Sequence, residues 1–210
     1  EAALAAVALI ASAVLDPQFS TRAGVISSYH PSVAPEYIRT VGYATKEDGG
    51  GACYTKAASQ PSHAGKLSIT LSGGATVWYE IVEGPYVTVA CFGMVGDGAT
   101  PNDAAFIDVQ QYAFRASYLY SNVKIVFPRG DFLFTGANPW GKWVTSAVAR
   151  GHVVFEGAGR YATKIRYQPV GAGPHYLYNG ENGTSGVGSS NQWVGALFRG
   201  MLFLVDGANM

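Results

Sequence analysis

Short apolar runs, separated by glycine, proline and polar clusters, predict a chain made mainly of β-strands. The first run is different, because EAALAAVALIASAVL at residues 1–15 is apolar on every side and rich in alanine, the best helix former. Asp16-Pro17 ends this predicted helix, since proline cannot continue it. With fewer than the roughly 20 residues of a bilayer span and no basic residues before it, the segment predicts neither a membrane helix nor a signal peptide.

Two apolar seams run along this predicted helix. They are formed by Val7, Ile10 and Val14, and by Leu4, Ala8, Ala11 and Leu15. Two seams on one short helix need partners on both sides, which a parallel trimeric bundle supplies. We therefore expect residues 1–17 to be a trimerisation or anchor helix; the alternative is a helix that docks on its own domain.

Residues 18–84 predict a small β module with few charges. A strand over 37–43 and its return over 52–56 flank the glycine turn at 46–51. A second hairpin is predicted from 67–71 and 75–82.

A third segment, residues 85–210, begins after Pro85 with a predicted strand over 86–92. A helix is expected from about residue 103 to 120, with the side chain of Asn102 or Asp103 accepting from the amides of its first turn. Its apolar face is predicted from these positions: Phe106, Val109, Ala113 and Ala116, extended by Ile107, Phe114 and Tyr118. We expect Ile107 and Phe114 to be buried against a following strand, at the positions Val123, Ile125 or Phe127.

Short strands follow this helix, and one long polar stretch interrupts them. The strands are predicted over 123–127, 132–134, 152–155, 163–167 and 197–205. The glycine-rich stretch at 171–192 is too long for an ordinary strand connection.

Composition supports an all-β protein and disfavours nucleic acid as a partner. Lysine plus arginine equals aspartate plus glutamate at 14 each, so no net field attracts a polyanion. Only 13% of residues are charged, against roughly 25% in typical domains. Together with 27 glycines and 13% aromatic residues, this low share of charged residues is typical of a β protein with many tight turns. It is also typical of a chain that buries surface against other copies of itself.

The cysteines and histidines do not indicate a metal or a cofactor. Cys53 and Cys91 have no Cys-x-x-Cys spacing, which favours two buried thiols over a disulfide. The histidines are scattered, without a helical i, i+4 pair.

The stretch FGMVGDGATPNDAAF at residues 92–106 combines glycines, one central aspartate and a polar cluster. It lacks the Gly-Lys-Ser/Thr of a phosphate loop and the ligand spacing of an EF-hand. Gly157-Ala158-Gly159 opens a dinucleotide-like pattern, but the β-branched segment at 163–167 follows it in place of the required helix.

Residues 89–107, the helix after them and the segment VKIVFPRG at 123–130 resemble the start of the pectate-lyase-like right-handed β-helix. In that family a Phe-Gly-Ala-x-Gly-Asp-Gly-like turn leads into a helix that covers the end of the coil, and a Val-x-Phe-Pro-x-Gly strand begins the first turns. Here Met94 replaces the alanine, and Pro101-Asn102-Asp103 replaces the commoner Asp-Asp-Thr. The resemblance implies a right-handed parallel β-helix capped by an α-helix.

Residues 37–79 look like the module that precedes the β-helix in bacteriophage tailspike and tail-fibre proteins, and the two resemblances together cover roughly 36–168. They imply a virion protein of the phage tail, assembled in the bacterial cytoplasm as a homotrimer. The implied partners are other tail or baseplate proteins, through the N-terminal region, and bacterial surface polysaccharide, which the β-helix binds or degrades further downstream. The alternative is a secreted bacterial polysaccharide-degrading enzyme with the same fold.

The expected roles of the 92–106 residues are structural. Gly93, Gly96 and Gly98 are expected to allow positive φ or close backbone approach, Asp97 to bond turn amides, and Asn102 or Asp103 to cap the helix. The carboxylates form no motif that assigns a catalytic pair, so we expect this region not to be catalytic. Tyr176, Tyr178 and Trp193, in and beside the long polar stretch, are candidate sugar-stacking residues; the alternative is a loop that packs on a neighbouring subunit.

Overall fold

A computed structural model of the chain describes residues 17–82, 84, 86–119, 122–136, 152–170 and 196–205. Its contacts divide the chain into two compact units between Val82 and Glu83. Each unit is described by itself. The predicted helix over residues 1–17 lies outside the described residues, apart from Pro17.

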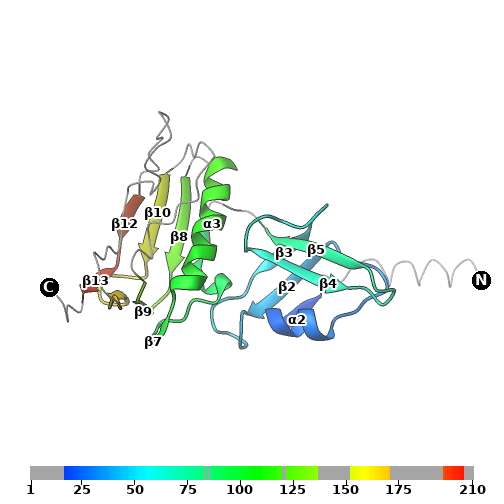
Figure 1. The fold of residues 1–210 in the computed structure, drawn as a ribbon, viewed down its shortest axis with the longest axis horizontal. Coiled ribbons are helices and arrows are strands. Elements are labelled where there is room, and N and C mark those ends of the chain that lie inside the picture. Colours follow the sequence, from blue (N-terminus) through cyan, green and yellow to red (C-terminus); the bar gives the residue numbers. More distant parts are fainter. Residues whose placement is uncertain are drawn as a thin grey trace, which may run out of the picture. The chain divides into compact units, whose positions relative to one another are not determined.

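The first unit is a five-stranded sheet with the strand order β1-β2-β3-β5-β4 (Figure 1). Its elements are β1 (Gln18–Thr21), α2 (Arg22–Ser28), β2 (Tyr37–Gly42), β3 (Cys53–Lys56), β4 (Lys66–Thr70) and β5 (Thr76–Ile81). Antiparallel pairing of β2 with β3 and of β4 with β5 confirms both predicted hairpins. β1 and α2 were not predicted; β1 pairs in parallel with β2, and the hydroxyl of Thr21 accepts from the N–H of Gly24 at the start of α2.

Alternation places the apolar side chains of this sheet on one buried face. The largest fully buried ones are Ile38, Tyr54, Leu67, Ile69 and Tyr79. The hydroxyl of Tyr79 donates to the carbonyl of Pro35 at 2.7 Å, and burial raises the pKa of that phenol. The module thus has a core of its own.

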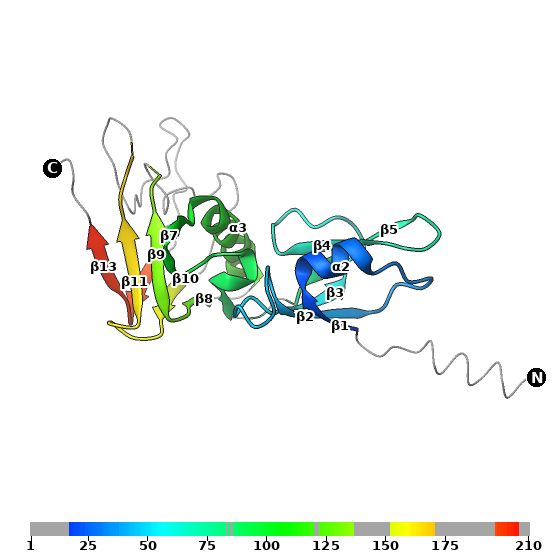
Figure 2. The same ribbon diagram turned by 90° about the horizontal axis from the view of Figure 1, so that it is seen from below.

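The second unit contains two four-stranded sheets in which every described pairing is parallel. One sheet has the order β12-β10-β8-β6, and the other has the order β13-β11-β9-β7 (Figures 1 and 2). The strands are β6 (Tyr86–Thr88), β7 (Asp97–Pro101), β8 (Asn122–Phe127), β9 (Gly130–Phe134), β10 (His152–Gly157), β11 (Thr163–Tyr167), β12 (Ala196–Arg199) and β13 (Leu202–Val205). Successive strands alternate between the sheets, so each turn of the chain contributes one strand to each. The fold is mainly β, as predicted, and this unit is a parallel two-sheet coil.

Apolar residues occupy the same position in successive turns of the coil. In one sheet Val87 aligns with Ile125, Ile125 with Phe155, and Phe155 with Phe198. The rings of Phe155 and Phe198 are stacked, with centroids 4.9 Å apart and planes 9° from parallel. Because β-branched and aromatic residues pack well on a pleated surface, this repeat stabilises the strands that carry it.

The helix α3 (Asp103–Leu119) is close to its predicted extent and packs against β8 and β10. Phe106 is fully buried, with its ring centroid 5.4 Å from Phe134 and 6.0 Å from both Phe127 and Phe155. The side chains of Val109, Tyr112 and Ala113 are buried with it.

The prediction that Ile107 is buried is wrong, because this side chain is only half-buried. Successive residues of an α-helix point about 100° apart, so a face centred on Phe106, Val109 and Ala113 turns Ile107 toward its rim. The side chains of Phe114, Ala116 and Tyr118 lie outside the described residues.

Two predicted strands have different boundaries in the structure. The run 86–92 is a strand only to Thr88, and a 3₁₀ helix over Val89–Phe92 follows with all four side chains buried. The run 197–205 divides at Gly200, whose φ of 65° bends the chain from β12 in one sheet to β13 in the other. Within the described ranges, no helix is both long and apolar enough to cross a membrane.

The prediction of two buried thiols is correct for one cysteine and wrong for the other. Cys91 is buried, Cys53 is half-buried, and no disulfide joins them.

Replacing Phe106 with alanine should lower the free energy of unfolding by about 3–5 kcal/mol, because it leaves a cavity among three aromatic rings. Ile107→Ala is the matched control on the same turn, with an expected loss under about 2 kcal/mol. Urea unfolding followed by circular dichroism measures both. Equal losses would contradict the assignment of Phe106 as the buried anchor of α3.

Candidate functional site

The 93–103 junction joins the first turn of the coil to α3, and three glycines shape it. Gly93 has a φ of 83° and ends the 3₁₀ helix, and Gly98 has a φ of 75°. At Gly96 an added Cβ would lie 2.9 Å from the Cα of Gly130 and 3.1 Å from the Phe132 ring. Positive φ at two positions and close backbone approach at the third therefore require glycine.

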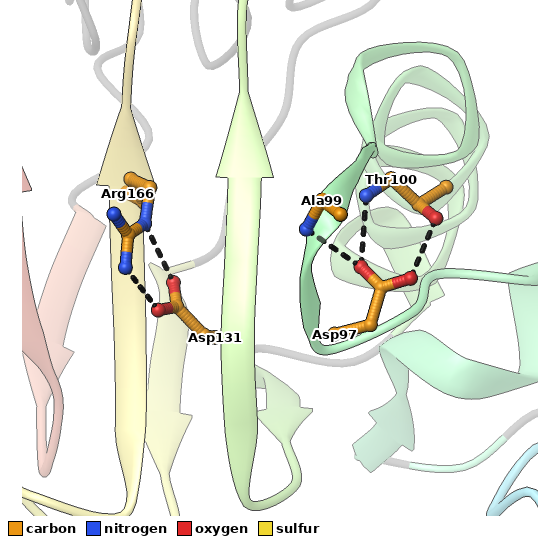
Figure 3. A network of polar contacts seen from close by, with 5 residues as sticks. All are labelled: Asp97, Ala99, Thr100, Asp131 and Arg166. Atoms are coloured by element: carbon orange, nitrogen blue, oxygen red, sulfur yellow. Dashed lines mark hydrogen bonds and ion pairs between the residues drawn. The ribbon is translucent and has the colours of Figure 1, made fainter.

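Asp97 stabilises the turn that follows. Figure 3 shows its Oδ1 accepting from the backbone N–H groups of Ala99 and Thr100, while its Oδ2 accepts from the Thr100 hydroxyl. These bonds, from Thr100 first and then Ala99, lower the pKa of Asp97 to about 2. Asp97 is therefore a permanently charged acceptor at neutral pH.

Asn102 is a buried amide whose side chain holds the turn together. Its Oδ1 accepts from the N–H of Val95 at 2.8 Å, and its Nδ2 donates to the carbonyls of Val95, Thr100 and Leu133. Its backbone carbonyl accepts from Phe106 N–H, the first bond of the helix. Asn102 thus has the backbone position of a cap, but the prediction that its side chain bonds the first-turn amides is wrong.

Asp103 connects the start of α3 to the end of β9. Its carboxylate accepts from the N–H and hydroxyl of Thr135 and from the N–H of Gly136, at 2.8–3.2 Å. The carboxylate is used for this tertiary contact in place of the predicted helix cap.

Two groups of charged residues lie on the strands of the coil. In one sheet Arg166 of β11 donates to both carboxylate oxygens of Asp131 on β9 (Figure 3). In the other, Glu156 of β10 pairs with Lys124 of β8 and with Arg199 of β12. The hydrogen bond from Lys124, together with the charges of Arg199 and Lys124, lowers the pKa of Glu156. Sequence reasoning missed both groups, because it did not establish which strands are neighbours.

Four carboxylates of the described coil can be compared with what glycoside hydrolysis requires. That chemistry needs two carboxyl groups about 5–9.5 Å apart across a sugar, and a general acid has a raised pKa. Asp97, Asp103, Asp131 and Glu156 have structural partners, and the resolved shifts of Asp97 and Glu156 are downward.

The remaining candidates are a metal site and the sugar-stacking residues. No group of three or more His, Cys, Asp or Glu side chains in the described ranges is arranged to hold a metal ion. The candidate sugar-stacking residues Tyr176, Tyr178 and Trp193, and the carboxylates of Glu181 and Asp206, lie outside the described residues.

Comparison with known proteins gives weak structural similarities only. No protein-family model matches the chain, and no curated protein does. Among solved structures, it is similar to tailspike protein gp49 from Acinetobacter baumannii bacteriophage Fri1, a capsular polysaccharide depolymerase, with a TM-score of 0.38 and 14% identity. The match covers 72% of this chain and 23% of that one.

A second similar structure is ORF18 of Geobacillus virus E2, with a TM-score of 0.31 and 16% identity over 74% of this chain and 28% of that one. The chain therefore spans less than a third of the length of either structure.

Asp97 should make the stability of the protein depend on pH in acid. Its folded pKa of about 2 is below the ordinary 3.8, so its contribution is complete above about pH 4 and is lost as the pH falls through 2. We expect Asp97→Ala to lower the Tm at about pH 6, and the difference from the unaltered protein to shrink toward pH 2.

Thr100→Val is the matched control, since it removes the hydroxyl donor and keeps both backbone donors. Its effect on the Tm should be the smaller one. A Tm difference for Asp97→Ala that is the same at both pH values would show that the carboxylate charge is not used in the turn.

Proposed function

We propose that this chain is the N-terminal region of a bacteriophage tailspike or tail-fibre protein. The observation that carries the proposal is the parallel coil whose first turn leads through the glycine-aspartate junction into a covering helix. The sequence resemblance links that combination, preceded by a small β module, to phage spikes. In this proposal the coil is a right-handed β-helix. Connections between parallel strands of one sheet are right-handed in about 98% of cases.

The coil is expected to continue in a longer protein. Phe203 and Val205 align with the inward positions of Ile165 and Tyr167, yet are 38% and 61% exposed. A further turn would cover them and pair with β12 and β13. The downstream part would bind or degrade bacterial surface polysaccharide, and the protein would function in the virion after assembly in the host cytoplasm.

Two long connections, between β9 and β10 and between β11 and β12, leave the coil from neighbouring positions. Their first residues are hydrogen-bonded to each other, because Gln168 N–H donates to Phe134 O and Val170 N–H donates to Thr135 O. The strands that follow them are also neighbours, since Val153 of β10 aligns with Ala196 of β12. Tyr176, Tyr178 and Trp193 belong to the second connection or its flank. We include them in the proposal as residues that contact polysaccharide.

The first part of the chain would connect the spike to the tail. Residues 1–17 would form a trimeric helix bundle, and the module at 18–84 would contact other tail or baseplate proteins. Light scattering on the 210-residue chain should then give the mass of a trimer. Val7→Lys with Ile10→Lys should convert it to monomer, because the seam of Val7, Ile10 and Val14 would then have to bury two lysines.

Ser12→Lys, outside both seams, is the control for an added charge and should leave the trimer intact. A stable monomer in the unaltered chain would reject trimerisation through this segment.

This region by itself should not degrade polysaccharide, because Asp97, Asp103, Asp131 and Glu156 of the coil already bond to turn amides, to Thr135 and Gly136, and to basic side chains. The assay incubates the chain and the longer spike with host capsule or lipopolysaccharide and follows release of reducing ends or unsaturated sugars. Only the longer spike should release them. Release by the 210-residue chain, abolished by one carboxylate substitution that leaves the Tm unchanged, would place the active site in this region.

A further inference from the structure

The later turns of the coil differ in charge from the whole chain. The chain is neutral, but residues 122–136, 152–170 and 196–205 contain six basic residues against two acidic ones. The basic residues are Lys124, Arg129, Arg160, Lys164, Arg166 and Arg199, and the acidic ones are Asp131 and Glu156. Both acidic residues already form ion pairs. The described residues from 122 onward therefore carry an excess of positive charge, whereas residues 86–119 have Asp97, Asp103 and Asp108 against Arg115.

Part of this excess lies at one edge of the coil, where short turns connect the sheets. The turn at 128–129 is joined to the next one, 158–162, by Gly130 N–H donating to Ala162 O and by the Thr163 hydroxyl donating to Pro128 O. The turn at 158–162 is joined to the third by Gly159 N–H donating to Gly200 O. These turns are stacked beside the starts of β9, β11 and β13 (Figure 2). We call them the short-turn edge.

The short-turn edge presents arginine on neighbouring turns together with one exposed aromatic ring. Arg129 and Arg160 are both exposed, and neither is paired with a carboxylate of the described chain. Tyr161 is 78% exposed, and the Arg160 guanidinium lies over its ring at 5.6 Å from the centroid. The turns that carry Arg129 and Arg160 are hydrogen-bonded neighbours, so both guanidinium groups are presented on the same edge.

We propose that the short-turn edge binds an anionic polysaccharide, with Arg129 and Arg160 contacting its carboxylate groups and Tyr161 stacking on a sugar ring. The guanidinium fork matches a carboxylate, and an aromatic face beside it suits the apolar face of a sugar. The polymer follows the direction in which the turns stack. This inference rests on the proposed function, because it specifies the class of host polysaccharide and adds a contact in this region that requires no catalysis.

Binding is measured by titration calorimetry on the 210-residue chain at low and high salt. The probes are alginate oligomers, in which every sugar has a carboxylate, neutral dextran oligomers of the same length, and single-stranded DNA of the same charge. We expect alginate to bind and dextran not to bind. Arg129→Glu with Arg160→Glu should weaken alginate binding about tenfold or more, since repulsion replaces attraction.

Matched variants separate this site from general charge effects. Lys46→Glu with Lys56→Glu makes the same change in net charge on the first unit and should leave the Kd unchanged. Tyr161→Ala should weaken alginate binding about threefold while keeping the charge. Arg129→Gln with Arg160→Gln, which removes both charges without reversing them, should also weaken alginate binding and tests the site if the charge reversal prevents folding.

Three outcomes would overturn the proposal: no binding of alginate, equal weakening by the Lys46 and Lys56 control, or DNA binding as tight as alginate and indifferent to Tyr161. The last would mean a surface that attracts any polyanion. A chain that forms a trimer and assembles into tails yet ignores alginate would reject this inference alone. Alginate binding by a chain that does not assemble into tails would reject the proposed function alone.

Discussion

In-register parallel pairing between one turn of the coil and the next determines most other features of the second unit. Ile165 aligns with Phe132 on one side and with Phe203 on the other, so each inward side chain packs on the side chain of the previous turn. A shift by one residue would turn Phe132 and Ile165 outward and bring Asp131 and Lys164 into the core. The pairing thus also places Arg166 and Asp131 where they can form an ion pair, and Glu156 between Lys124 and Arg199.

The junction before α3 fixes where this pairing begins. Asn102 bonds to Val95 in its own turn and to Leu133 in the next, while Asp103 holds the residues that follow β9. A buried amide or carboxylate with several partners of fixed geometry is costly to rearrange, because each lost bond leaves a polar group unsatisfied. The helix therefore has a defined position over the end of the coil, and Phe106 reaches the aromatic core from it.

The sequence alone was sufficient where a local pattern carries the signal. Alternation across a glycine turn predicted both hairpins of the first unit, and helical spacing located α3 to within one residue at each end. Strand β7 was missed because Asp97-Gly98-Ala99 has turn composition and becomes a strand only by pairing with β9. The role of Asp103 was misassigned for the same reason, since its side-chain partners Thr135 and Gly136 lie more than thirty residues away. The side chain of Asn102 bonds mainly within its own turn, to Val95 and Thr100, and the preference of asparagine for helix caps did not reveal this. The pair Glu156–Arg199 depends on contacts at a separation of 43 residues, which no motif reveals.

The glycines of the short-turn edge allow little change in the chain. An added Cβ at Gly157 would lie 2.3 Å from the carbonyl oxygen of Gly200 and 2.8 Å from the Thr163 side chain. The connections between β9 and β10 and between β11 and β12 are much longer than these short turns, and long connections tolerate insertion better than tight turns do. A protein built in this way can acquire new sequence on one side of its coil while the other side keeps its length. For protein engineering, the connection between β9 and β10 is thus the place to insert a foreign peptide, and the turn at 128–129 is the place to avoid.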